Sequence, residues 1–259
     1  MIENTPSPAA QHKPNTEPTT APKIHAVDAG HGLTWIADAF DLFKQSAGMW
    51  ILMTIMIAVI SIVLTALGPL AIAINILAPI LTGGLMLGCR DQSQGQELHF
   101  EHLFAGFREH TGQLATVGAL YLLGSIAVVV LAIIVALGTG GASALMAAIG
   151  GNHNAAALAG LGVGFLMALL VFLAAAIPLI MALWFAPALV VFHNVAAIDA
   201  MKQSFSACLR NIFPFLLWGV MFILLGIVGV VTLGLGFLVI IPVQIISIYT
   251  AYKDIFAVA

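Results

Sequence analysis

The side chains best suited to chemistry lie between residues 97 and 110, where histidines and glutamates are mixed. His99 and His102 stand three residues apart, so a helix would turn both rings toward one ion, with carboxylates close by. The polar face of a surface helix accounts for the same residues, and we favour that interpretation. We therefore predict no metal and no other cofactor. The candidate ligands considered are Glu97, His99, Glu101, His102, Glu109 and His110.

No other pattern in the chain is typical of catalysis. There is no Ser-His-Asp order, no nucleophile elbow, and no glycine loop followed by Lys-Ser or Lys-Thr. We predict that the protein is not an enzyme. The net charge of -3 and the short basic stretches also speak against nucleic acid binding.

The composition indicates that membrane-spanning helices position these residues. The chain is 61% hydrophobic and 7% charged with a mean hydropathy of +1.10, too apolar for a water-soluble domain. Its 259 residues leave room for roughly six spans of about 20 residues. We predict an all-α, polytopic transmembrane helical bundle. The spans are expected at about 49–67, 69–89, 114–137, 161–191, 213–233 and 237–252, with a short helix at 142–149 in the longest outer connection.

The charges favour one orientation. Every Lys and Arg lies in the N-terminal tail, in alternate connections or at the C-terminus, and the acidic residues fall on the same side. The positive-inside rule then places both termini in the cytoplasm of a bacterial inner membrane. Cys89 and Cys208 fall at that boundary, so no disulfide is expected. Residues 1–30, rich in proline, are predicted to be a disordered cytoplasmic tail before a six-span domain at 31–259.

Three amphipathic stretches, at 33–47, 98–113 and 194–210, each precede an apolar hairpin. The middle one has large apolar residues at i, i+3, i+4 and i+7, so we predict interfacial helices lying on the inner leaflet. Thr34 and Asn194 are candidate N-caps, and Trp50 suits the headgroup layer. The residues predicted to end the helices in the left-handed conformation are Gly48, Gly112 and Asn211. The predicted interfacial anchors, with membrane lipids as partners, are Trp35, Phe40, Phe43, Phe100, Phe104, Phe107 and Phe205.

Two of these stretches match in sequence. Phe40-x-x-Phe43-Lys44-x-x-x-Gly48 corresponds to Phe104-x-x-Phe107-Arg108-x-x-x-Gly112 in its aromatic, basic and glycine positions. The match predicts a parallel threefold helix-plus-hairpin repeat, arranged about the membrane normal, with a degenerate third copy. The alternative is that amphipathic helices simply accompany spans. The predicted modules cover about 31–90, 96–192 and 194–254.

Polar and proline residues inside the spans have two possible roles. No ionisable side chain lies at mid-membrane depth, which argues against proton-driven transport. Asn75 and Gln244 lie near Pro79 and Pro242, where they could bond carbonyls freed by a kink or line a solute path. We favour the first role. Kinks are also expected at Pro178 or Pro187, and close helix contacts at Gly83, Gly84 and Gly88.

The stretch WFAPALVVFHNVAAIDAMKQSFSACLRNIFPFLLWGV, residues 184–219, resembles a family of bacterial six-span inner membrane proteins of uncharacterised function. The family pattern F-A-P-A-L-V followed by A-[LM]-K-x-S-F stands here at residues 185–190 and 200–205, and residues 241–256 resemble its last span. A more distant likeness connects the chain to the membrane domain of some glycerophosphodiester phosphodiesterases. No catalytic domain follows here, so the resemblance implies a fold and a location but no activity.

Two functions are compatible with these features. The first is a non-catalytic inner-membrane protein that serves as a lipid-facing or partner-binding platform. The alternative is a transporter or channel for a neutral or amphiphilic solute, with a path lined by Asn75, Gln244 and the proline kinks.

Overall fold

The computed structural model describes residues 22–108, 110–151 and 155–256, and within these ranges every regular element is a helix. Six helices are long and apolar enough to cross a membrane, as predicted. Residues 1–21 of the predicted tail and the candidate ligand Glu109 lie outside the described residues. In order, the elements are α1 (His31–Gln45), α2 (Ala47–Ala66), η1 (Gly68–Ile72), α3 (Ala73–Ser93), η2 (Phe100–Phe107), α4 (Thr111–Ala136), η3 (Leu137–Gly141), α5 (Ala142–Ile149), α6 (Ala155–Trp184), α7 (Ala186–His193), α8 (Ala197–Arg210), α9 (Ile212–Val231) and α10 (Phe237–Phe256).

The long helices form three hairpins, α2–α3, α4–α6 and α9–α10, whose tips match the sequence predictions. Gly68 begins the first tip with φ at 63°, and Gly234 turns the third with φ at 90°. Both angles suit glycine, which has no Cβ to clash. The short helix expected at 142–149 is α5, with the same bounds.

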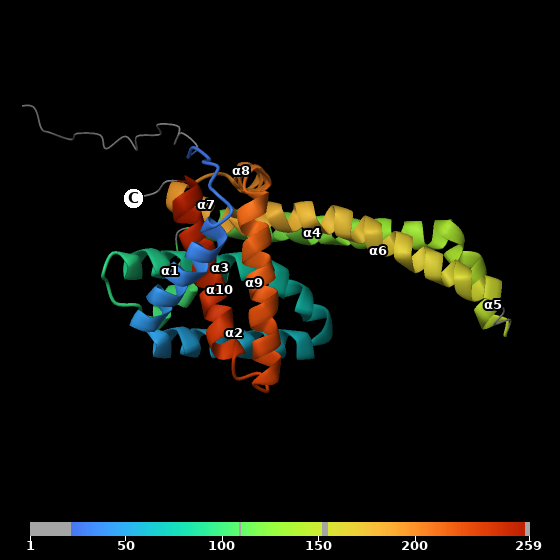
Figure 1. The fold of residues 1–259 in the computed structure, drawn as a ribbon, viewed down its shortest axis with the longest axis horizontal. Coiled ribbons are helices and arrows are strands. Elements are labelled where there is room, and N and C mark those ends of the chain that lie inside the picture. Colours follow the sequence, from blue (N-terminus) through green and yellow to red (C-terminus); the bar gives the residue numbers. More distant parts are fainter. Residues whose placement is uncertain (1–21, 109, 152–154, 257–259) are drawn as a thin grey trace, which may run out of the picture.

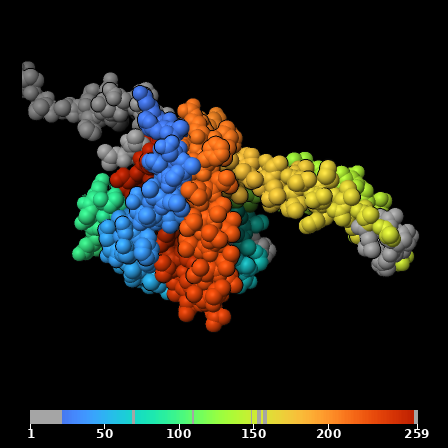
Figure 2. All heavy atoms as spheres, viewed as in Figure 1, coloured from blue at the N-terminus to red at the C-terminus, as the bar shows by residue number. Residues whose placement is uncertain are grey.

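The three hairpins extend in different directions (Figure 1). The α4–α6 hairpin, with η3 and α5 at its end, projects as an arm that runs crosswise to α9–α10 (Figure 1) and stands clear of the body in the space-filling view (Figure 2). Along the arm, α4 packs chiefly against α6, and large apolar side chains such as Leu123, Ile134 and Phe165 are exposed. The helix contacts of the outer part, which involve η3 and α5, are mainly with other elements of the arm.

The core lies at one end of the hairpins, which we call the base. The base consists of α1, η2, α7 and α8, the first turns of α2, α4 and α9, and the last turns of α3 and α10. Its buried side chains include Trp35, Trp50, Leu103, Phe185 and Tyr252, whereas the outer halves of the hairpins are mostly exposed. The base therefore holds the molecule together, and the hairpins extend from it.

Within the base, the amphipathic segments link the three hairpins in a ring. α1 packs on α10 of the last hairpin, η2 packs on α3 of the first, and α8 packs on α6 and α7 of the second. Each segment thus contacts the second long helix of the preceding hairpin, and α1 completes the circle. This arrangement supports the threefold repeat, which stays a prediction.

The junctions between amphipathic segments and spans share one backbone conformation. It occurs at Ser46 (φ -142°, ψ 42°), His110 (φ -117°, ψ 14°) and Asn211 (φ -120°, ψ 36°). The prediction of left-handed residues at Gly48, Gly112 and Asn211 was therefore wrong. The chain turns two residues before each glycine, and both glycines lie inside the following helix.

The central amphipathic segment is a 3₁₀-helix, η2, and not the predicted α-helix. With three residues per turn, Phe100, Leu103 and Gly106 share the face that packs inward, whereas Phe104 and Phe107 point outward. The tighter turn brings Gly106 against the Ile80 carbonyl of α3, where a Cβ would not fit. A glycine also permits the close contact on the α3 side. Gly84, where a close helix contact was predicted, lies against the His102 carbonyl.

The fourth predicted span is broken, because α6 ends at Trp184 and α7 starts at Ala186 with Pro187 in its first turn. The Ser204 hydroxyl of α8 bridges the break, donating to the Met181 carbonyl (2.6 Å) and accepting from the Phe185 amide (2.8 Å). Polar groups freed by the break are thereby bonded. Pro79, Pro187 and Pro242 are buried where each second helix enters the base, but Pro178 is exposed on the arm.

Two asparagines have roles different from those predicted. Asn194 is the left-handed residue (φ 51°) that ends α7, and not the N-cap of α8. Asn211 is fully buried, and its amide accepts from Val27 N (2.9 Å) and donates to the His25 carbonyl (3.0 Å). Residues 25–27 are thus held on the base, so the prediction of disorder up to residue 30 was wrong there.

Candidate functional site

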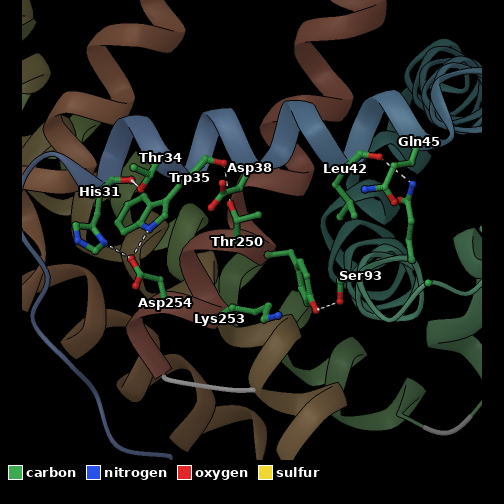
Figure 3. Close-up of a pocket in the computed structure, with 13 residues that line it drawn as sticks. His31, Thr34, Trp35, Asp38, Leu42, Gln45, Ser93, Thr250, Lys253 and Asp254 are labelled. Atoms are coloured by element: carbon green, nitrogen blue, oxygen red, sulfur yellow. Dashed lines mark hydrogen bonds and ion pairs between the residues drawn. The ribbon is translucent and has the colours of Figure 1, made fainter.

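The first polar cluster of the base fastens α1 to α10. Trp35 Nε1 donates to Asp254 Oδ2 over 2.7 Å, and His31 Nδ1 lies 2.7 Å from the same oxygen. The Thr250 hydroxyl donates to the Trp35 carbonyl (2.8 Å), so three polar contacts join the two helices (Figure 3). A buried indole N–H needs such an acceptor, which explains why the acidic residue stands at the end of α10.

The second polar cluster fastens α1 and α2 to α3. Gln92 is buried near the end of α3, and its amide accepts from Trp50 Nε1 (3.0 Å) and donates to the Leu42 carbonyl (2.8 Å). One side chain thus bonds both helices of the first hairpin and the segment before it. Sequence reasoning overlooked Gln92 and Asp254; a polar residue in the last turn of an apolar span is the signal that could have found them.

A polar cleft of about 650 Å³ opens between these two clusters (Figure 3). Asp38, Lys253 and Asp254 give it charges of both signs, and the Tyr249 hydroxyl is tied to Ser93 over 2.8 Å. Most of its polar side chains are therefore engaged in bonds between helices. The arrangement is typical of a structural joint that water can reach.

The histidine cluster forms a structural cap at the start of η2. The His99 amide donates to His102 Nδ1 (3.0 Å), and His102 Nε2 lies 3.2 Å from Asp91 Oδ2. Both nitrogens of His102 are thus engaged in fixing the start of η2 on α3. Among the described residues no group of three or more His, Cys, Asp or Glu side chains is placed to hold a metal.

The predicted interfacial anchors divide into exposed and buried residues. Phe40 is 44% exposed, Phe104 40% and Phe107 41%, whereas Trp35 is 1% exposed and Phe43 5%. The prediction that Trp35 and Phe43 anchor the protein in lipid was therefore wrong. Both side chains belong to the face of α1 that packs against the core. Trp50 is buried as well and does not face the headgroups. Phe100 and Phe205 are half-buried, against α3 and in an apolar groove between α8 and the arm.

The predicted kink and path residues are separate in space from the polar clefts. The Asn75 side chain donates to the Ile72 carbonyl (3.2 Å), one turn back, and not to a carbonyl freed by Pro79. The carbonyl that Pro79 leaves free belongs to Asn75 itself and lies against Gly118 of α4. Neither Asn75 nor Gln244 lines the cleft between the two polar clusters or the apolar groove beside the arm.

Comparison with known proteins identifies the family. A family model described as "Predicted integral membrane protein (DUF2189)" matches residues 67–182, which end just before the Phe185–Val190 motif. A protein of Burkholderia thailandensis described as "Probable inner membrane protein" is 30% identical over 207 residues, covering 78% of this chain and 75% of that protein.

No solved structure matches the chain. Neither match concerns the glycerophosphodiester phosphodiesterases, so that more distant likeness has no support. The similarity to the Burkholderia protein extends along most of both chains and agrees with the six apolar helices. This chain therefore belongs to the same family as the probable inner membrane protein of Burkholderia thailandensis, and its residues 67–182 are similar to the integral membrane family described as DUF2189.

Proposed function

We propose that the protein is a non-catalytic platform of the bacterial inner membrane, whose base lies against the lipid of the inner leaflet. The observation that carries the proposal is the exposure of Phe40, Phe104 and Phe107 on the amphipathic segments α1 and η2. Phenyl rings this exposed are unfavourable in water, because full burial of a Phe side chain is favoured over exposure by about 1.5–3 kcal/mol of free energy. At the base they lie where the spans leave the membrane, at the depth of the headgroups and first methylenes.

The lipid contact can be tested by the depth of a probe. Each of two single substitutions, Phe104→Cys and Asp38→Cys, is labelled with an environment-sensitive fluorophore in nanodiscs. We expect spin-labelled acyl chains to quench the probe at position 104 severalfold more than aqueous iodide does, and the reverse at position 38, which lies on the polar side of α1. Equal iodide quenching at both positions would contradict the platform.

The orientation proposed for this platform places both termini in the cytoplasm, because the seven Lys and Arg residues in the described part of the chain lie on the side of the base. We expect Leu233→Cys, at a tip residue that is 94% exposed, to react in intact cells with a membrane-impermeant maleimide. Lys44→Cys, at the base, should react only after the cells are opened. The opposite labelling pattern would contradict the proposed orientation.

The native thiols should not disturb this measurement. Cys89 and Cys208 are both buried, and Cys208 donates weakly to the Met181 carbonyl over 3.6 Å. Burial raises the pKa of Cys208 to about 12, so its reactive thiolate is scarce at neutral pH. Wild-type protein should therefore label only after denaturation.

A further inference from the structure

A small pocket lies where α3, α7 and α10 end. It measures about 240 Å³, and Arg90 of α3, His193 of α7 and Lys253 of α10 line it together with Phe192, Tyr249 and Tyr252. We call it the central pocket. The helices α3, α7 and α10 thus each contribute one cationic or imidazole side chain to the same pocket, because all three enter the base.

The charge of the central pocket is positive. Its lining includes a guanidinium and an ammonium group but no carboxylate. Among the described residues, no carboxylate oxygen lies within ion-pairing distance of the Lys253 amine; the neighbouring Asp254 is engaged by Trp35 and His31. Arg90 is held over the Phe192 ring (5.5 Å to its centre), and only its Nε contacts Asp91, over 3.2 Å. Both cations remain available to an anion.

Two buried polar atoms at this pocket have no hydrogen-bond partner in the described part of the chain. They are the Tyr252 hydroxyl and His193 Nε2. Buried polar atoms are nearly always bonded, so each orphan indicates a missing partner. Water would satisfy both atoms but would leave the Lys253 ammonium group, which has no carboxylate partner among the described residues, without a counter-ion. An oxyanion would satisfy all four groups at once.

We propose that the central pocket binds a phosphate group, with Arg90 and Lys253 balancing its charge and Tyr252 and His193 bonding its oxygens. Guanidinium and ammonium groups are the usual phosphate partners in proteins. The pocket exceeds the size of one phosphate, so it accommodates free phosphate or the phosphate of a lipid headgroup. This proposal is independent of the lipid platform, because it rests on none of the exposed phenylalanines.

The test measures the thermal midpoint of the full chain in a neutral detergent. Sodium phosphate is titrated against sodium chloride and sodium acetate at equal ionic strength, and phosphatidylglycerol is titrated against phosphatidylcholine in parallel. We expect a saturable rise in the midpoint with phosphate, which indicates a soluble ligand, or with phosphatidylglycerol alone, which indicates a headgroup. No rise in either arm, or an equal rise with acetate, would overturn the proposal.

Variants separate the pocket from general screening of charge. Lys253→Gln and Arg90→Gln should weaken the apparent affinity by about tenfold or more, since each removes a charge-assisted bond. Lys44→Gln, whose exposed amine pairs with Asp41 at 2.7 Å outside the pocket, should bind as wild type does. Tyr252→Phe should weaken binding severalfold without lowering the midpoint of the unliganded protein, because its hydroxyl has no partner to lose. Equal losses in Lys44→Gln and Lys253→Gln would contradict a defined site.

Discussion

Trp35→Ala should lower the stability of the protein by about 3–5 kcal/mol, the range for removing a buried aromatic side chain. The indole packs against Phe215 at 5.3 Å between ring centres and bonds Asp254. Its loss leaves a cavity between α1 and α10 and removes one of the bonds that close the ring of the base. Thermal unfolding in detergent, followed by circular dichroism, measures the effect.

Two matched variants isolate the cause. Phe40→Ala on the same helix should cost less than about 1 kcal/mol in detergent, because that ring is largely exposed. Trp35→Phe keeps most of the ring and removes the N–H donor, so we expect an intermediate loss of about 1–3 kcal/mol. If Trp35→Ala unfolds no earlier than Phe40→Ala, α1 does not pack on α10 as described.

Gly106→Ala should also destabilise the protein, by about 1–3 kcal/mol, as overpacking of a tight contact typically does. A Cβ at this position would meet the backbone carbonyl of Ile80, and neither backbone can move without separating η2 from α3. Thermal midpoints in detergent report the loss of stability. Gly106→Val should lower the midpoint more than Gly106→Ala does.

Gly48→Ala is the control for this substitution. Position 48 lies within helix α2, and a Cβ there would project into open space. Alanine is favoured over glycine in a helix by up to about 1 kcal/mol. We therefore expect an unchanged or raised midpoint. A marked loss at position 48 would instead support the left-handed conformation that the sequence pattern favoured.

Pattern and structure disagree most about which faces of the amphipathic segments point inward. In the matched pair, Phe40 and Phe104 are both exposed, but Phe43 is buried and its counterpart Phe107 is 41% exposed. The sequences agree, yet α1 is an α-helix and η2 a 3₁₀-helix, so equal spacing places the second ring on different faces. Gly106, which permits the close packing of η2, aligns with Leu42 of α1, at a position that the matched motif leaves unspecified.

The sequence by itself determined the helical class, the six apolar spans, the turns at Gly68 and Gly234, and helix α5. These features depend on a continuous apolar run or a local backbone preference, which neighbouring residues specify without distant partners. Only the tertiary structure decided that Trp35 is buried on Asp254, that Asn211 holds residues 25–27, and that Arg90, His193 and Lys253 line one pocket. Those outcomes depend on groups far apart in the chain, separated by up to 219 residues in the Trp35–Asp254 bond. No local pattern specifies which of several apolar or polar faces packs against a given distant element.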